Sequence, residues 1–351
     1  MRYVFVGAGA VGSAIGGLLA SAGKDVLLVA RGEHARALAG RGLTLRCPDA
    51  SPTLHVPSAS GPEEARLTTD DVLVLTTKTQ QAQEAVAQWA DAPVRDADGA
   101  VVGRAGDLLP ILTALNGVTG EEIALRYFAR VLGVCVWFPA VMIEPGEVWV
   151  RGYPLRGIFH AGRYGAAQHP AADRRLLDAL AADWGAAELR VLQPADVMRW
   201  KYRKLLSNLG NVLQALLGEA AEEADDVRRA AEAEGREVLA AAGIDVPDRD
   251  EVREAWSDYS AEPVPGEPAM LGGSTWQSLV RGSGSIETDY LNGEVALLAR
   301  RSGRAAPVNA ALAALGRRAA REGLTPGATS VAELRAAVGP EPGPSRPPAA
   351  D

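Results

Sequence analysis

Several residue types are scarce in this sequence, and each scarcity excludes a class of protein. Only two cysteines occur in 351 residues, Cys47 and Cys135, and neither belongs to a CxxC motif or a histidine cluster. This usage argues against a disulfide framework or a metal site, and it is typical of a reducing compartment. Basic residues do not dominate either, because the formal net charge is -8. A nucleic-acid partner is therefore not expected.

Long apolar runs are also lacking. No stretch approaches the roughly 18 consecutive apolar residues that a membrane-spanning helix needs. The N-terminal segment superficially resembles a signal peptide, but Gly7, Gly9 and Gly12 interrupt its apolar part. We therefore expect a soluble, cytoplasmic protein without membrane contact.

The most informative pattern lies at the N-terminus. An apolar run over residues 2–6 is followed by a glycine turn, a small-residue helical pattern and a second apolar run over 26–29. This succession of strand, turn, helix and strand is the unit that binds a dinucleotide. Gly7 permits the tight turn, Gly9 lets the backbone approach the pyrophosphate, and Gly12 lets the helix pack on the strand. The predicted cofactor loop consists of Gly7, Ala8, Gly9, Ala10, Val11 and Gly12.

The residue after the second strand distinguishes between the two nicotinamide dinucleotides. An acidic residue there binds a ribose 2′-hydroxyl, whereas an arginine favours a 2′-phosphate. The sequence has Arg31 at this place, while Asp25 precedes the strand and Glu33 lies beyond its end. The pattern favours NADP(H) over NAD(H), and the alternative is that Arg31 is a solvated loop cation.

The chain is longer than one hydrophobic core usually allows, so two domains are expected. Over residues 1–192, strand-like apolar runs alternate with helical patterns. This predicts an α/β Rossmann-type domain with a doubly wound, mostly parallel sheet. Over residues 193–330 the patterns are helical, which predicts an all-α domain for substrate binding and dimerisation. Residues 339–351 are rich in proline and are expected to be a disordered tail.

Further predictions concern single segments of these two domains. Residues 93–106 read as an inserted surface loop and residues 245–268 as an extended connection. Apolar faces along residues 215–217 and 297–299 are candidates for packing a second subunit in a homodimer. The helices expected in the second domain cover residues 196–217, 220–242, 286–302 and 308–322.

A helical segment carries the candidate chemistry. A nicotinamide-dependent reductase needs a group that protonates the carbonyl oxygen, and the four histidines lie in segments that suit this role poorly. Lys204 and Asn208 stand four residues apart and therefore project from one helical face, with Lys201 and Asn211 three residues to either side. A cation and carboxamides on one face suit a 2-oxo acid, whose keto oxygen and carboxylate they would bind. The alternative is a solvated basic helix start.

A second polar cluster surrounds Ser274 and Thr275. Either hydroxyl could bind a substrate carboxylate or cap the helix that follows. Glu287 opens the next helical segment, where the helix dipole favours a carboxylate in any case.

Taken together, these residues resemble the ketopantoate reductase (2-dehydropantoate 2-reductase) family, in order from residue 1 to about 323. The resemblance implies a Rossmann domain, an all-helical C-terminal domain and an active site in the cleft between them. It also implies NADPH-dependent reduction of a 2-oxo acid to a 2-hydroxy acid, in pantothenate biosynthesis for the founding members. The resemblance rests on the glycine loop, Arg31, Lys78 and the strings Leu115–Val118, Lys204–Asn208 and Ile286–Glu294.

The resemblance also assigns roles to single residues. Lys204 is implied as the proton donor and Asn208 as its neighbouring substrate ligand, and Thr275 takes the place of a substrate-binding serine. The implied substrate ligands are Asn208, Asn211, Thr275, Ser274 and Asn116. The implied cofactor ligands beyond the glycine loop are Arg31, Lys78, Asn116, Ala140 and Glu287.

Two departures from the family pattern concern the substrate. A further asparagine expected one turn after Asn208 is Val212, and another falls near Glu222, which would repel a carboxylate. We therefore carry three hypotheses: reduction of ketopantoate, reduction of another 2-oxo acid or carbonyl compound, and NADPH binding without catalysis.

Overall fold

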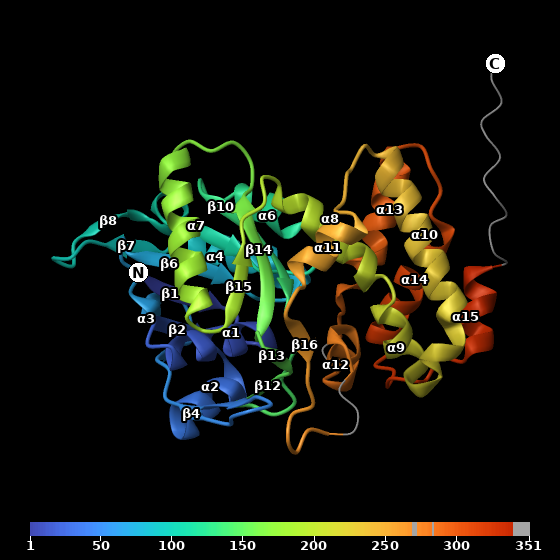
Figure 1. Ribbon diagram of the computed structural model, residues 1–351, viewed down its shortest axis with the longest axis horizontal. Coiled ribbons are helices and arrows are strands. Elements are labelled where there is room, and N and C mark those ends of the chain that lie inside the picture. The colour runs from blue at the N-terminus through green and yellow to red at the C-terminus, as the bar shows by residue number, and fades with distance from the viewer. Residues whose placement is uncertain (269–271, 283, 340–351) are drawn as a thin grey trace. The chain divides into compact units, whose positions relative to one another are not determined.

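The computed structural model describes residues 1–268, 272–282 and 284–339, which form two compact units (Figure 1). The first unit consists of residues 1–205 and 246–268, and the second of residues 206–245 and the described part of 272–339. The boundary therefore falls later than the expected 192/193, and the chain returns to the first unit before completing the second. Apart from Gly339, the expected tail lies outside the described residues.

The main sheet of the first unit has eight strands in the order β15-β14-β10-β9-β6-β1-β2-β5. Neighbouring strands run parallel except for the antiparallel pair β10–β14. The order reverses at β1, which is the switch point where doubly wound sheets bind ligands. The strands are β1 (Arg2–Val6), β2 (Asp25–Val29), β5 (Ser58–Ala59), β6 (Asp71–Leu75), β9 (Ile111–Thr113), β10 (Val131–Trp137), β14 (Gly157–Arg163) and β15 (Leu189–Leu192).

Three smaller sheets complete the strands of this unit. They are β11-β12-β3-β4, with β3 (Leu43–Arg46), β4 (Thr53–Leu54), β11 (Ala140–Val141) and β12 (Glu147–Val150); β13 (Gly152–Pro154) with β16 (Tyr259–Ala261); and β7 (Pro93–Arg95) with β8 (Val101–Arg104). The helices are α1 (Ala10–Ser21), α2 (Gly32–Arg41), α3 (Pro62–Ala65), η1 (Thr79–Gln81), α4 (Ala82–Ala90), α5 (Ala105–Leu108), α6 (Gly120–Leu125), α7 (Pro170–Gly185) and α11 (Arg249–Ala255). Helix α8 (Val197–Asn208) begins in this unit and ends in the second.

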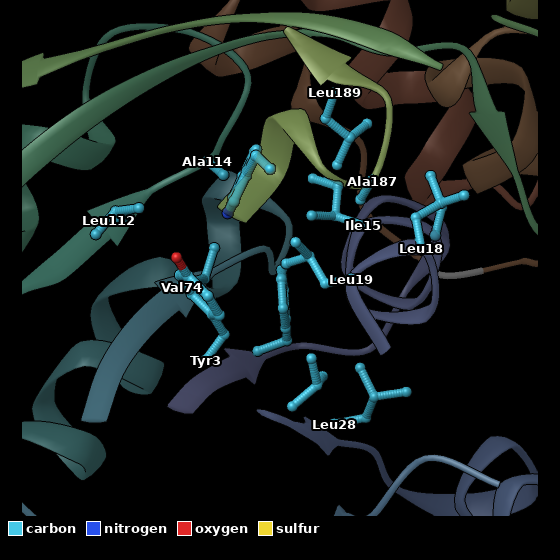
Figure 2. Packing of buried hydrophobic residues seen from close by; sticks show 14 of the residues in the cluster. Tyr3, Ile15, Leu18, Leu19, Leu28, Val74, Leu112, Ala114, Ala187 and Leu189 are labelled. Carbon is cyan, nitrogen blue, oxygen red and sulfur yellow. The ribbon is translucent and has the colours of Figure 1, made fainter. Parts of the chain in front are cut away.

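Continuous apolar runs form the buried sheet, as expected for parallel strands covered on both faces. Figure 2 shows sheet residues such as Tyr3 and Val74 packed beside Ile15 and Leu19 of α1. The helix approaches closely because it carries Gly16, where a Cβ would lie 2.6 Å from a methyl group of Leu28. Burial of each such aliphatic side chain contributes about 1.5–3 kcal/mol.

Among the residues that the structure describes, the second unit contains helices only, and the predicted fold class is confirmed. The helix predicted over residues 196–217 is nevertheless wrong as one element, because α8 ends at Asn208 and α9 begins at Asn211. Gly210 lies in the break, and a Cβ there would come within 2.9 Å of the Arg228 side chain. The helices are α9 (Asn211–Leu217), η2 (Gly218–Ala224), α10 (Asp225–Ala241), α12 (Ser274–Val280), η3 (Glu287–Tyr290), α13 (Asn292–Arg301), α14 (Pro307–Arg321) and α15 (Val331–Val338).

Further expectations also need correction. Residues 93–106 are not a loop, because β7 and β8 pair as a hairpin there. Residues 245–268 are not simply extended, since they contain α11 and the strand β16. The apolar face at residues 215–217 is buried in the protein's own fold and offers no surface to a second subunit. Within the described ranges, no helix has the length and apolar character needed to cross a membrane.

Candidate active site

The glycine loop joins β1 to α1 with the geometry that a phosphate-binding turn requires. Gly7 has a φ of +105°, and a Cβ there would lie 2.9 Å from the backbone nitrogen of Thr77. A Cβ at Gly12 would lie 2.4 Å from the carbonyl oxygen of Gly7, so this position must be glycine for the helix to pack on the strand. A Cβ at Gly9 would meet no protein atom within 4 Å, so the protein's own packing does not require glycine there. The room left at Gly9 suits a ligand that approaches the backbone.

The start of α1 suits an anion. Its N-cap is Gly9, no side chain caps the helix, and its first turn carries no acidic residue. The first backbone N–H groups of a helix lack partners inside the helix, and the helix dipole makes them attract negative charge. The loop therefore fits the pyrophosphate of a dinucleotide.

A series of hydrogen bonds holds the glycine loop in place. The Gly146 N–H donates to His34 Nδ1 at 3.0 Å, so the His34 proton lies on Nε2, which faces Ser13 Oγ at 3.0 Å. Ser13 Oγ donates in turn to the carbonyl oxygen of Ala8 at 2.9 Å. Burial lowers the pKa of His34, which favours the neutral ring that this arrangement needs. His34 thus has a structural role, because it links the residue after the Glu144–Pro145 turn to the start of α1.

Arg31 lies at the carboxyl end of β2, where it is the N-cap of α2. Its guanidinium group donates to Ser60 O at 3.3 Å and to Gln88 Oε1 at 3.0 Å, both of which are uncharged. Asp25 begins β2 and so lies at the opposite end of the strand, while Glu33 is exposed and pairs with Arg36. Neither acidic residue therefore occupies the position at the carboxyl end of β2 that Arg31 holds.

Lys204 reaches the carboxyl ends of the neighbouring strands β9 and β10. Its Nζ donates to Asn116 Oδ1 at 3.0 Å and also to the carbonyl oxygen of Val136. The aromatic ring of Trp137 lies 5.7 Å from the same ammonium group. Two neutral carbonyl oxygens and an aromatic ring thus lie next to the ammonium group, which places a cation at these strand ends.

Asn116 is held in place by its backbone. Thr79 Oγ1, at the start of η1, donates to the carbonyl oxygen of Asn116 at 3.1 Å. Lys201 Nζ donates to the carbonyl oxygen of Leu115 at 3.2 Å. Lys78 precedes η1 as its N-cap, so it follows β6 at the same edge of the sheet. The structure therefore gathers Lys78, Asn116 and Lys204 at adjacent strand ends.

Lys201 does not share the surroundings that helical spacing suggested. It is 2% exposed and forms an ion pair with Glu121, which is fully buried. Thr113 Oγ1 donates to the same carboxylate at 2.7 Å, so the pair is part of a buried network. Sequence reasoning missed Glu121, which stands five residues after Asn116 and three beyond the Leu115–Val118 string that carried the family resemblance.

The expected substrate ligands of the second unit have varied positions. Asn208 is half-buried at the end of α8, but Asn211 is the first residue of a separate helix, so the expectation of one continuous polar face is wrong for it. Val212 is 2% exposed, whereas Glu222 is exposed on η2. The acidic group at Glu222 is therefore solvated.

Ser274 and Thr275 open α12, but neither caps it. The N-cap is Gly273, whose N–H donates to Gln214 Oε1 at 2.8 Å. The capping alternative for the two hydroxyl groups is thus removed, and Thr275 is 2% exposed. Glu287 is 4% exposed at the start of η3. In the first unit, Ala140 belongs to β11, and this strand lies against α1.

The parallel sheet, the glycine loop at its switch point and the helical second unit define the class: a two-unit protein with a Rossmann-type dinucleotide-binding fold. Family models give it a more particular place: "Ketopantoate reductase PanE/ApbA" matches residues 3–164, and "Ketopantoate reductase PanE/ApbA C terminal" matches residues 196–320. The chain belongs to this family.

Named relatives are similar at modest identity. A 2-dehydropantoate 2-reductase from Pyrococcus horikoshii is 30% identical over 59% of this chain and 61% of its own length. Another from Pyrococcus abyssi is 26% identical over 88% of this chain and 94% of its own length. The matched segment thus spans less than two thirds of the first relative but nearly all of the second.

Solved structures share the fold over nearly the whole chain. A ketopantoate reductase of the same family from Ralstonia eutropha JMP134 has a TM-score of 0.69 at 27% identity, and it covers 92% of this chain and 99% of its own. D-mandelate dehydrogenase, solved with NADH and anilino(oxo)acetate, has a TM-score of 0.72 at 20% identity and the same coverage, which shows likeness of fold.

Proposed function

We propose that this protein uses NADPH to reduce a 2-oxo acid to a 2-hydroxy acid, with Lys204 as the proton donor. The observation that carries the proposal is the position of the Lys204 ammonium at the ends of β9 and β10. The strands β1, β6, β9 and β10 run parallel, so the glycine loop that follows β1 lies at this same edge of the sheet. A hydride acceptor next to the cofactor would therefore have a cation within reach of its oxygen.

Different residues of the first unit have different proposed roles in cofactor binding and in the reaction. Gly7 to Gly12 would hold the pyrophosphate and Arg31 the 2′-phosphate. Bound NADPH supplies the hydride. Lys204 would stabilise the charge that develops on the keto oxygen and transfer a proton to it, while Asn116 Oδ1 fixes the direction of the ammonium group. Lys78 and Ala140 are proposed as further cofactor contacts.

The proposed ligands of the second unit rest on the family resemblance. Asn208, Ser274 and Thr275 would hold the substrate carboxylate, Asn211 is a weaker candidate because it begins a separate helix, and Glu287 would contact the cofactor. Two substrates compete. The names of the relatives favour 2-dehydropantoate and a place in pantothenate biosynthesis. The buried, apolar side chain of Val212, where an amide was expected, favours a different 2-oxo acid.

The experiment that tests the reaction follows the oxidation of NADPH by absorbance with 2-dehydropantoate and a panel of other 2-oxo acids. Saturable turnover with any of them supports the proposal. Lys204→Met should lower kcat by two to four orders of magnitude, which is the usual contribution of a general acid. NADPH binding by calorimetry is the control and should change little. Turnover near the wild-type rate in Lys204→Met would remove this residue from its role.

A second experiment tests the choice of cofactor. Arg31→Ala should raise the KM for NADPH about tenfold or more and leave the KM for NADH nearly unchanged, because only NADPH has the 2′-phosphate. Arg36→Ala on the same helix is a matched control, since its charge pairs with Glu33 in an exposed position. An equal effect of Arg31→Ala on both cofactors would contradict NADP selectivity.

With its two cysteines free and buried, we place the protein in the reducing cytoplasm.

A further inference from the structure

Residues 246–268 form a segment whose role the fold does not by itself explain. It leaves the helical part of the chain and returns to the first unit, where β16 pairs with β13 (Figure 1). Three side chains of the first unit hold it there. Arg151 binds Glu267 through two hydrogen bonds of 2.9 Å, Arg199 binds Glu251 at 3.1 Å, and Arg190 donates to the Ser257 carbonyl oxygen at 2.6 Å.

The clamped segment packs one large side chain against Trp137, the residue whose ring lies beside Lys204. The ring of Trp256, which follows α11, packs edge-on against the ring of Trp137 with centroids 5.1 Å apart. Tyr259 contacts Trp256 in the same manner at 5.3 Å. Trp137 is the last residue of β10, directly after Val136, whose carbonyl oxygen accepts from Lys204. The Trp137 ring lies 5.7 Å from the Lys204 ammonium.

The surface that these two indoles offer is apolar. Both residues are half-buried, but the indole nitrogens of Trp137 and Trp256 are fully buried. What each ring exposes is therefore carbon. Large aromatic faces of this kind bind flat or bulky apolar groups, and they discriminate against hydroxyl groups, for which they provide no partner.

We propose that residues 246–268 are a specificity element, in which Trp256 and Trp137 form an aromatic wall beside Lys204. The inference rests on the proposed reductase function and names its substrate class: a 2-oxo acid whose side chain is aromatic or bulky and apolar. A keto oxygen that reaches the Lys204 ammonium would bring the adjoining side chain within range of the Trp137 ring. Trp256 then fixes the Trp137 ring and widens the wall.

The first test measures binding without turnover. Oxamate and N-phenyloxamate are unreactive analogues of 2-oxo acids that differ by one phenyl ring. Calorimetry with the wild-type protein saturated with NADPH should show N-phenyloxamate binding at least tenfold more tightly than oxamate. Equal affinities, or tighter binding of oxamate, would overturn the inference without any variant being needed.

The second test uses variants of the wall. Trp256→Leu should reduce the preference for N-phenyloxamate, and the matching ratio of kcat/KM for phenylpyruvate over 2-oxobutanoate, by about tenfold, whereas Trp256→Phe should retain most of both. Arg253→Ala is the matched control, because this exposed side chain lies on the adjoining helix α11 and pairs only with Asp250 among the ion pairs of the described residues. Unchanged ratios in Trp256→Leu would overturn the inference.

Outcomes for the substrate class and for the reaction itself are distinguishable. Turnover of 2-dehydropantoate with a higher kcat/KM than any aromatic 2-oxo acid would overturn the inference and leave the reductase function standing. Absence of turnover with every 2-oxo acid, despite tight NADPH binding, would overturn both.

Discussion

The two lysine-bearing turns of α8 differ in what surrounds their ammonium groups. Lys201 is buried, and its charge is opposed by the carboxylate of Glu121, which Thr113 also contacts. Lys204, one turn later, is half-buried and meets the amide oxygen of Asn116 and the carbonyl oxygen of Val136. The same residue type therefore serves two purposes. One lysine fastens the helix to the sheet, and the other presents its charge at a strand end.

One helix thus carries the same side chain in two settings: in a buried ion pair at Lys201 and, one turn later, at the ends of β9 and β10. Lys201 donates to Leu115 O and Lys204 to the side chain of the next residue, Asn116. The buried ion pair thus sets the distance between α8 and the end of β9. The contribution of this ion pair to stability can be measured by unfolding, independently of turnover.

The largest effect is expected from breaking the buried pair. Lys201→Met or Glu121→Gln each leaves one uncompensated buried charge, which should lower the free energy of unfolding by about 3–5 kcal/mol. The double variant contains no buried charge there and should be clearly more stable than either single variant. Urea-induced unfolding measures all three. A loss below about 1 kcal/mol in both single variants would show that the pair does not fasten the helix.

An intermediate effect on stability is expected at His160, whose ring packs against Trp200, the residue before Lys201. The His160 ring stacks on Trp200 with centroids 3.6 Å apart, and neither ring nitrogen has a hydrogen-bond partner among the described residues. Burial lowers the pKa of His160 to about 3. Between this value and the ordinary value near 6.5, the unfolded chain binds a proton that the folded protein does not, so stability falls as the pH falls.

His160→Phe should remove this sensitivity, because it keeps a flat ring and has nothing to titrate. Between pH 6.5 and 5 the wild type should lose about 1–2 kcal/mol more than the variant. The measurement is urea-induced unfolding at several pH values. The stabilising contribution of the neutral ring is fully present above about pH 6.5 and is lost as the pH decreases toward 3. Parallel pH profiles of the two proteins would contradict the prediction.

The smallest effect on stability is expected at the second lysine. Lys204→Met keeps the apolar stem and removes a charge that carbonyl oxygens solvate, so the free energy of unfolding should change by about 1 kcal/mol or less. The same variant is expected to lose most of its turnover. If Lys204→Met lost as much stability as Lys201→Met, both lysines would have the same structural role, contrary to the prediction.

Much of the first unit follows from local patterns. The strand β10 has the same limits as the apolar run over residues 131–137, and the glycine turn after β1 needs particular residues at fixed spacing. Contacts between distant residues could not be read in this way. The pairing of Lys201 with Glu121 joins residues 80 positions apart, and the packing of Trp256 on Trp137 depends on where the chain returns after its helical excursion. Gly210 could have indicated the helix break, but the strong helical pattern on both sides concealed it.

The return of the chain also bears on the order in which the protein is made. The first unit gains β16 and α11 only after residues 206–245, which belong to the second unit, have been synthesised. During translation the glycine loop, the sheet and Lys204 all emerge from the ribosome before Trp256 does. The nascent first unit therefore passes through a stage that has its main sheet but lacks one edge of its surface, and a fragment ending at residue 205 would remain at that stage.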